Sequence, residues 1–117
     1  EHLSKFMTIW MPFVDVDDEV GGLIVYEGSQ LSGMTEHGPS GAWANKSDTD
    51  LSDYTSRHVI MEAGDALMFP PTLLHGSAPH RSTTTNRLSI DFRVFPEKEY
   101  TTRSYYDPVT NSVTRQH

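Results

Sequence analysis

The stretch GDALMFPPTLLHGSAPHRSTTTNRLSIDFR, residues 64–93, decides the fold. Its short apolar runs are separated by a Gly-Asp turn, prolines and a Ser/Thr-rich loop, a pattern typical of short strands joined by turns. One run stops at His75, and Arg87 follows at the start of the next. A core has little use for either side chain, whereas a metal site that binds a carboxylate would use both. We therefore predict strands within 73–78 and 86–95, paired as a hairpin around a candidate site.

The remaining strand patterns extend this prediction to the whole domain. FMTIWMPFVDV (6–16) and LIVYEG (23–28) are rich in β-branched and aromatic residues, and the acidic turn between them predicts a second hairpin. Residues 57–71 contain two further short strands around the turn Ala63-Gly64-Asp65. No segment shows a helical period over ten residues, so we expect little helix. The sequence thus favours an all-β sandwich or barrel.

Two polar segments lie outside these strands. Residues 29–56 are dense in Gly, Ser, Asp, Thr and Asn. Structureless loops of this length are uncommon in compact domains, so the segment is interpreted either as a lid-like loop or as a mobile surface loop. The tail, residues 97–117, is polar and Tyr-rich, with one turn signal at Tyr106-Asp107-Pro108-Val109. We expect a single domain over residues 1–117.

Composition excludes several classes of function. The chain has 117 residues, 16 acidic against 9 basic, for a formal charge of −7. This charge argues against nucleic-acid binding. The absence of cysteine excludes disulfides and thiolate metal sites. No apolar stretch approaches the roughly 20 residues of a membrane span and no secretory signal is visible, so we expect a cytoplasmic protein without a membrane partner.

The strand pattern around Arg87 allows two interpretations. Alternation places Arg87, Ser89, Asp91 and Arg93 on one face and Leu88, Ile90, Phe92 and Val94 on the other. The polar face could be solvent-exposed above an apolar core. Alternatively, Arg87 and Ser89 could bind a carboxylate together, while Asp91 and Arg93 pair with each other. His75 could likewise be a hydrogen-bonded core residue or a metal ligand.

Taken together, these motifs resemble the Fe(II)- and 2-oxoglutarate-dependent dioxygenases of the phytanoyl-CoA dioxygenase type. The resemblance covers about residues 8–95 and rests on IWMPFVDVDDEVGGLIVYEGSQ (9–30), GDALMF (64–69), His75 and Arg87. It implies a double-stranded β-helix, a cupin-like jelly roll, of which this chain would be the C-terminal two-thirds, lacking its N-terminal strands. The family's Pro-Gly-Ser-His segment reads EGSQ here, a departure that concerns loop shape.

The resemblance also implies roles for individual residues. His75 would be the distal iron ligand, and Arg87 would bind the far carboxylate of 2-oxoglutarate. Ser89 would complete the Arg-x-Ser motif, and Ser77 and Trp10 occupy positions that contact the co-substrate. The implied cofactors are Fe(II) and 2-oxoglutarate, and the implied reaction is hydroxylation of a small-molecule substrate with release of succinate and carbon dioxide.

One part of the family pattern is missing. A facial iron site needs two histidines and one carboxylate, and the family's His-x-Asp or His-x-Glu motif does not occur in this chain. His2 lacks the acid two residues later. The other four histidines, His37, His58, His80 and His117, are predicted to be surface imidazoles.

Three functions are therefore open. If the missing pair precedes Glu1, the protein is an oxygenase. Without iron, it could be a cupin-like module that binds a small carboxylate. A structural remnant, with Arg87 paired to Asp91 or Glu62, is the third possibility. Unpaired edge strands would also favour a homo-oligomer.

Overall fold

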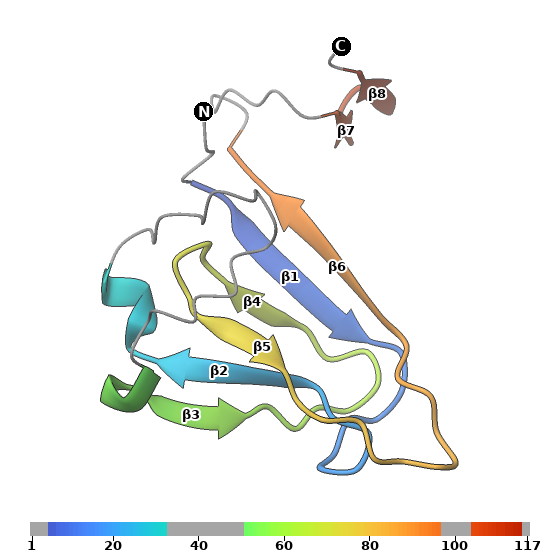
Figure 1. Ribbon diagram of the computed structural model, residues 1–117. Helices are drawn as coiled ribbons and strands as arrows, with labels where there is room; N and C mark the ends of the chain where they lie inside the picture. Colours follow the sequence, from blue (N-terminus) through green and yellow to red (C-terminus); the bar gives the residue numbers. More distant parts are fainter. Residues whose placement is uncertain (1–4, 33–50, 97–103, 116–117) are drawn as a thin grey trace.

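The computed structural model describes residues 5–32, 51–96 and 104–115, which form short strands and 3-10 helical turns (Figure 1). The strands are β1 (Met7–Pro12), β2 (Leu23–Glu27), β3 (Thr55–His58), β4 (Leu67–Phe69), β5 (His75–Ser77), β6 (Ser89–Val94), β7 (Tyr105–Asp107) and β8 (Ser112–Thr114), and the helical turns are η1 (Ser29–Ser32) and η2 (Leu51–Asp53). The predicted β-rich fold with little helix is thus confirmed for the described residues. None of their helices has the length and apolar character needed to cross a membrane.

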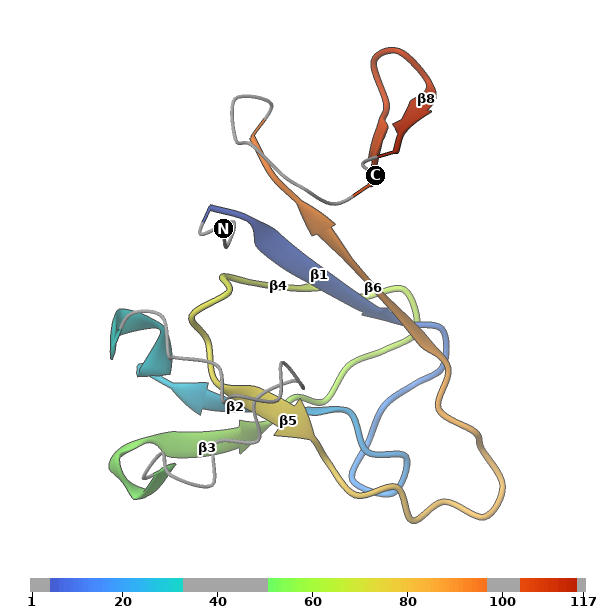
Figure 2. The same cartoon turned by 45° about the horizontal axis from the view of Figure 1, so that its top comes forward.

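Six of the strands form two three-stranded antiparallel sheets. The first sheet has the order β4-β1-β6 and the second has the order β3-β2-β5. Figure 2 shows the two sheets as separate layers, with the β7–β8 hairpin beyond them. In the sequence, β2 and β3 follow β1, and β5 lies between β4 and β6. The chain therefore passes several times from one sheet to the other.

Both predicted hairpins are wrong. β1 pairs with β4 and β6, whereas β2 pairs with β3 and β5. β5 and β6 likewise lie in different sheets. The reason is the length of the connections, residues 13–22 and 78–88, because a hairpin loop has only about two to five residues. Connections of this length let the chain pass from one layer to the other.

The core lies between the two sheets. Along β1 every second residue is buried, namely Thr8, Trp10 and Pro12. Trp10 packs in one apolar cluster with Phe69 from β4 and Leu23 from β2. The cluster also contains Val16, Val20 and Met61. Burial of side chains from both layers holds the sheets face to face.

The structure contradicts the interpretation that the polar face of β6 is the solvent face. Trp10 lies directly opposite Asp91, and Pro12 opposite Ser89. Directly opposite residues share a face of the sheet, so the polar side chains of β6 lie on the inner side. The apolar residues Leu88, Ile90, Phe92 and Val94 are 40% to 61% exposed. A polar solvent face over an apolar core is therefore wrong for this strand.

Only the ends of the predicted lid-like loop, 29–56, can be described. Residues 29–32 form η1, and residues 51–56 form η2 and the start of β3. The middle of the loop, residues 33–50, lies outside the described residues. In the tail, the turn signal near Asp107 belongs to the β7–β8 hairpin, in which the Asp107 side chain accepts a hydrogen bond from the Val109 amide at 2.8 Å.

Candidate functional site

A cleft of about 410 Å³ opens between the two sheets. This volume lies within the range of small-molecule sites. Four of the predicted site residues line the cleft, namely Trp10, His75, Ser77 and Ser89. The other lining residues are Leu23, Phe69, Gly76 and Asp91. Both sheets therefore contribute to one cleft that carries an imidazole, two hydroxyl groups and a carboxylate.

His75 begins β5 and lies in the wall of this cleft. Its Nδ1 atom lies 3.0 Å from the carbonyl oxygen of Leu73. A carbonyl only accepts, so Nδ1 donates, and in the neutral ring Nε2 therefore has the lone pair. The ring also packs against Phe69, with 4.7 Å between the ring centroids. Metal-binding histidines are commonly oriented by such a bond from the second ring nitrogen, so His75 suits a role as a metal ligand through Nε2.

Ser29, the first residue of η1, fixes the start of β5, although the sequence predicted no role for it. The residue is 1% exposed. The hydroxyl donates to the Tyr26 carbonyl at 2.6 Å and accepts from the Leu74 amide at 2.9 Å. The Tyr26 amide in turn donates to the Leu74 carbonyl at 3.0 Å. Ser29 thereby positions the residue directly before His75. The available signal was the EGSQ segment, which keeps the Gly-Ser pair of the family motif.

Replacing Ser29 by alanine should lower the free energy of unfolding by about 1–3 kcal/mol, because the part-buried Leu74 amide would lose its partner. Denaturant unfolding measures this change. Ser32→Ala is the matched control, since Ser32 lies in the same helical turn and its bond to the Tyr54 hydroxyl is exposed. The control should change stability by no more than about 0.5 kcal/mol. Equal losses in both variants would contradict this role of Ser29.

Arg87 does not line the cleft. Its Nη1 group donates to the carbonyl oxygens of Gly21 at 3.1 Å and Gly22 at 3.3 Å, just before β2. A structural remnant would need Arg87 to pair with Asp91 or Glu62, and neither carboxylate is paired with Arg87. The Asp91 carboxylate instead lies 3.5 Å from Arg93. The predicted Asp91–Arg93 pair is confirmed. Among the described residues, the other N–H groups of the Arg87 guanidinium have no hydrogen-bond partner.

The turn at residues 17–22, which holds Gly21 and Gly22, is closed by Asp17. Its carboxylate accepts hydrogen bonds from the Val20 amide at 2.8 Å and the Glu19 amide at 2.9 Å. The bond from Val20, with a smaller contribution from Glu19, holds the pKa of Asp17 below its usual value against the opposing effect of desolvation. The ionised form is therefore favoured in the folded protein.

This lowered pKa predicts a pH dependence of stability. The contribution of Asp17 is complete above the ordinary aspartate pKa of about 3.9 and is lost as the pH falls through the lowered folded value. Asp17→Asn keeps an acceptor oxygen but removes the charge. We expect the melting temperature of this variant to lie below that of the wild type at neutral pH, with the difference closing in acid. A difference that is independent of pH would contradict the assignment.

The remaining histidines do not complete a metal site in the described part of the chain. Within residues 5–32, 51–96 and 104–115, no three His, Asp or Glu side chains are grouped so that they could hold a metal ion. His80 is hydrogen-bonded to the Val20 carbonyl at 2.7 Å. The prediction that His58 is a surface imidazole is wrong, because its side chain is only 21% exposed and is hydrogen-bonded through both nitrogens. His2, His37 and His117 lie outside the described residues.

Comparison with known proteins agrees with the motifs. The family model for phytanoyl-CoA dioxygenase (PhyH) matches residues 1–88, a range that includes His75 and Arg87. The chain is 30% identical, over 110 aligned residues, to 1-deoxypentalenic acid 11-beta-hydroxylase from Streptomyces exfoliatus. That alignment covers 83% of this chain but 38% of the hydroxylase, so the chain spans about two fifths of the length of this curated relative. No solved structure gives a significant match.

Proposed function

Because the chain belongs to the phytanoyl-CoA dioxygenase family, we propose that it carries part of the active site of a non-haem Fe(II)- and 2-oxoglutarate-dependent oxygenase that hydroxylates a small molecule. The observation that carries this proposal is the cleft, which brings His75 together with Ser77, Ser89 and Trp10. The name of the Streptomyces relative, a hydroxylase, supports the reaction type.

The fold proposed with this function is part of a double-stranded β-helix. Two antiparallel sheets face each other, and the chain changes sheet between β1 and β2, between β3 and β4, between β4 and β5, and between β5 and β6. Such crossing is expected for a jelly roll, in which neighbouring strands of the sequence alternate between two sheets. The arrangement places the residues at the start of β5 and β6 on two sides of one cavity.

His75 is the described residue that fits an iron ligand. The Leu73 carbonyl holds Nδ1, which leaves the Nε2 lone pair for the metal. A second histidine and a carboxylate would complete the facial triad, and the residues described do not supply them. Within residues 5–32, 51–96 and 104–115, the proposed contribution to the site is therefore one ligand and the surroundings of the co-substrate.

The co-substrate surroundings combine hydroxyl groups with a guanidinium. We propose that Ser77, Ser89 and Trp10 contact 2-oxoglutarate in the cleft, and that the N–H groups of Arg87 not bonded to the glycine carbonyls bind its far carboxylate. Arg87 precedes Ser89 by two residues. A guanidinium has five donors in a fixed plane, so Nη1 can be held by carbonyls while the opposite edge binds a carboxylate.

When bound, the iron would supply the oxidative chemistry, in which dioxygen and 2-oxoglutarate are converted to succinate and carbon dioxide while a C–H bond of the substrate becomes C–OH. The residues of this chain bind, orient and shield. Leu23, Phe69 and Trp10 contribute apolar surface to the cleft, and a co-substrate bound against this surface would displace water, which would strengthen its polar interactions.

Formation of succinate by the full-length protein tests this function. With Fe(II), 2-oxoglutarate and oxygen, slow succinate formation without substrate is expected, and His75→Ala should abolish it. The rival function, a module that binds a small carboxylate without catalytic iron, predicts 2-oxoglutarate binding without any succinate. That result would contradict the proposed oxygenase.

A further inference from the structure

The turn at residues 17–22 holds the connection between β5 and β6 through four successive carbonyl groups. The donors all come from residues 78–87 of that connection. The Glu19 carbonyl accepts from the amides of Arg81 and Ser82, the Val20 carbonyl from His80, the Gly21 carbonyl from Arg87, and the Gly22 carbonyl from the Ala78 amide and Arg87. The connection that joins His75 to Arg87 is therefore placed by this turn.

Gly21 and Gly22 permit this close approach. Gly21 has a φ of 71°, and a Cβ atom there would lie 2.2 Å from the Pro79 carbonyl oxygen. A Cβ atom at Gly22 would lie 2.5 Å from Cγ1 of the buried Val16. A side chain at Gly21 would push the turn away from the connection, and one at Gly22 would clash with Val16 in the core. The peptide unit between the two glycines is thus held closely on both sides.

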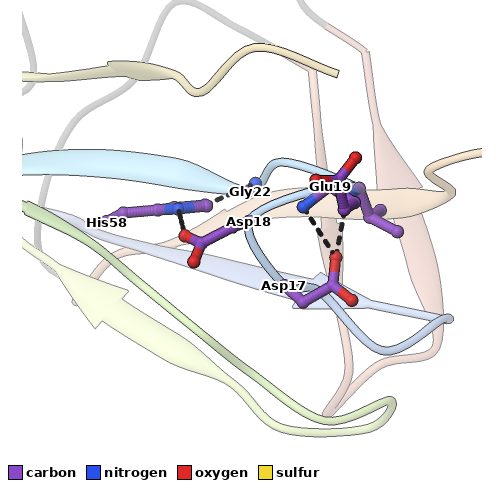
Figure 3. A network of polar contacts seen from close by, with 6 residues as sticks. Asp17, Asp18, Glu19, Gly22 and His58 are labelled. Atoms are coloured by element: carbon purple, nitrogen blue, oxygen red, sulfur yellow. Dashed lines mark hydrogen bonds and ion pairs between the residues drawn. The ribbon is translucent and has the colours of Figure 1, made fainter. Parts of the chain in front are cut away.

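His58 and Asp18 hold the other end of the same peptide unit (Figure 3). The Gly22 amide donates to Nε2 of His58 at 3.1 Å, so this nitrogen accepts and Nδ1 carries the proton. Nδ1 lies 3.0 Å from the Asp18 carboxylate and donates to it. The N–H of the Gly21–Gly22 peptide therefore faces His58, while its C=O, from Gly21, accepts from Arg87.

We infer that His58 and Asp18 are positioning residues for Arg87. Asp18 fixes the orientation of the His58 ring, the ring fixes the Gly21–Gly22 peptide, and the peptide carbonyl holds Nη1 of Arg87. This inference rests on the proposed function, in which Arg87 binds the far carboxylate of 2-oxoglutarate. Loss of the His58 acceptor should weaken 2-oxoglutarate binding although His58 does not line the cleft.

Three substitutions of His58 separate its two hydrogen bonds. His58→Gln can keep an acceptor near the place of Nε2, His58→Asn can keep a donor near Asp18 only, and His58→Leu keeps neither. For the full-length protein with Fe(II) under anaerobic conditions, we expect His58→Leu and His58→Asn to raise the Kd of 2-oxoglutarate by about 2- to 10-fold, the value of roughly one hydrogen bond. His58→Gln should recover most of the affinity. Calorimetric titration measures each Kd.

Hydrogen exchange gives a second measurement. The Gly22 amide should exchange faster in His58→Leu and His58→Asn than in His58→Gln, because only the glutamine offers it an acceptor. Arg57→Gln is the matched control, since Arg57 precedes His58 on β3 and its ion pair with Glu27 is exposed. The control should leave the Kd unchanged. If His58→Leu does not fold, Asp18→Asn replaces it, because the Asp18 side chain is 86% exposed.

The outcomes separate this inference from the proposed function. If Arg87→Lys weakens 2-oxoglutarate binding but all His58 and Asp18 variants bind normally, the positioning role is wrong and the function stands. If all three His58 variants lose affinity and stability equally, without recovery in His58→Gln, His58 is merely structural and the inference is overturned. If Arg87→Lys also binds normally, the proposed anchor itself is wrong.

Discussion

Substitution of His75 by alanine is expected to lower the affinity of the full-length protein for Fe(II) by more than about 100-fold, because loss of second-shell partners alone typically costs 10- to 100-fold and His75 is a proposed direct ligand. The imidazole is fixed by the Leu73 carbonyl, with Nε2 left for the metal. Anaerobic competition with a chromophoric chelator measures the affinity.

Two controls make the His75 result specific. His75 is exposed in the cleft wall and packs against Phe69, so its truncation should lower the free energy of unfolding by no more than about 1.5 kcal/mol. His80→Ala removes an imidazole outside the cleft and should leave the Fe(II) affinity unchanged. Unchanged Fe(II) affinity in His75→Ala would exclude this residue as a ligand.

Arg87→Lys is expected to raise the Kd of 2-oxoglutarate by roughly 10- to 100-fold, because an ammonium group cannot replace the two-pronged pairing of a guanidinium with a carboxylate. The hydrogen bonds of Arg87 give a second reason for the loss of affinity. Nη1 already serves two glycine carbonyls, so the far carboxylate depends on the remaining N–H groups. A lysine ammonium would have to divide three donors between the carbonyls and the carboxylate.

Arg57→Lys is the matched control for Arg87→Lys. It makes the same exchange on an exposed arginine whose pair with Glu27 lies on the surface. Exposed ion pairs contribute little, so 2-oxoglutarate binding should not change. Equal affinity of the wild type and Arg87→Lys would remove Arg87 from the binding site, even if iron binding persists.

The local character of the strands could be predicted from the sequence, but their pairing could not. Runs rich in apolar, β-branched and aromatic residues predicted β1, β2 and β6 to within a few residues. The predicted hairpins are wrong because strands that are adjacent in the sequence lie in different sheets. The choice between a hairpin and a crossing depends on burial of Trp10, Leu23 and Phe69 in one core, which is a non-local property.

The candidate site could be predicted only in part, because its motifs are local in the sequence whereas its supporting contacts are not. Trp10, His75, Ser77 and Ser89 carried a recognisable pattern, and the structure places them in one cleft. The supporting contacts were missed because their partners are distant in the sequence. Ser29 bonds to Leu74, and His58 to Gly22 and Asp18. A single sequence contains no signal for such pairs, and a histidine like His58 resembles any surface histidine until its two partners are known.

The dependence of 2-oxoglutarate binding on Fe(II) tests the central claim most directly. Calorimetric titration of the full-length protein under anaerobic conditions, with and without Fe(II), is the measurement. If His75 helps to hold an iron that chelates 2-oxoglutarate while Arg87 holds its far end, tight binding should require the metal and should weaken in Arg87→Lys. Equal affinity with and without Fe(II) would contradict the oxygenase and leave a carboxylate-binding module as the better account.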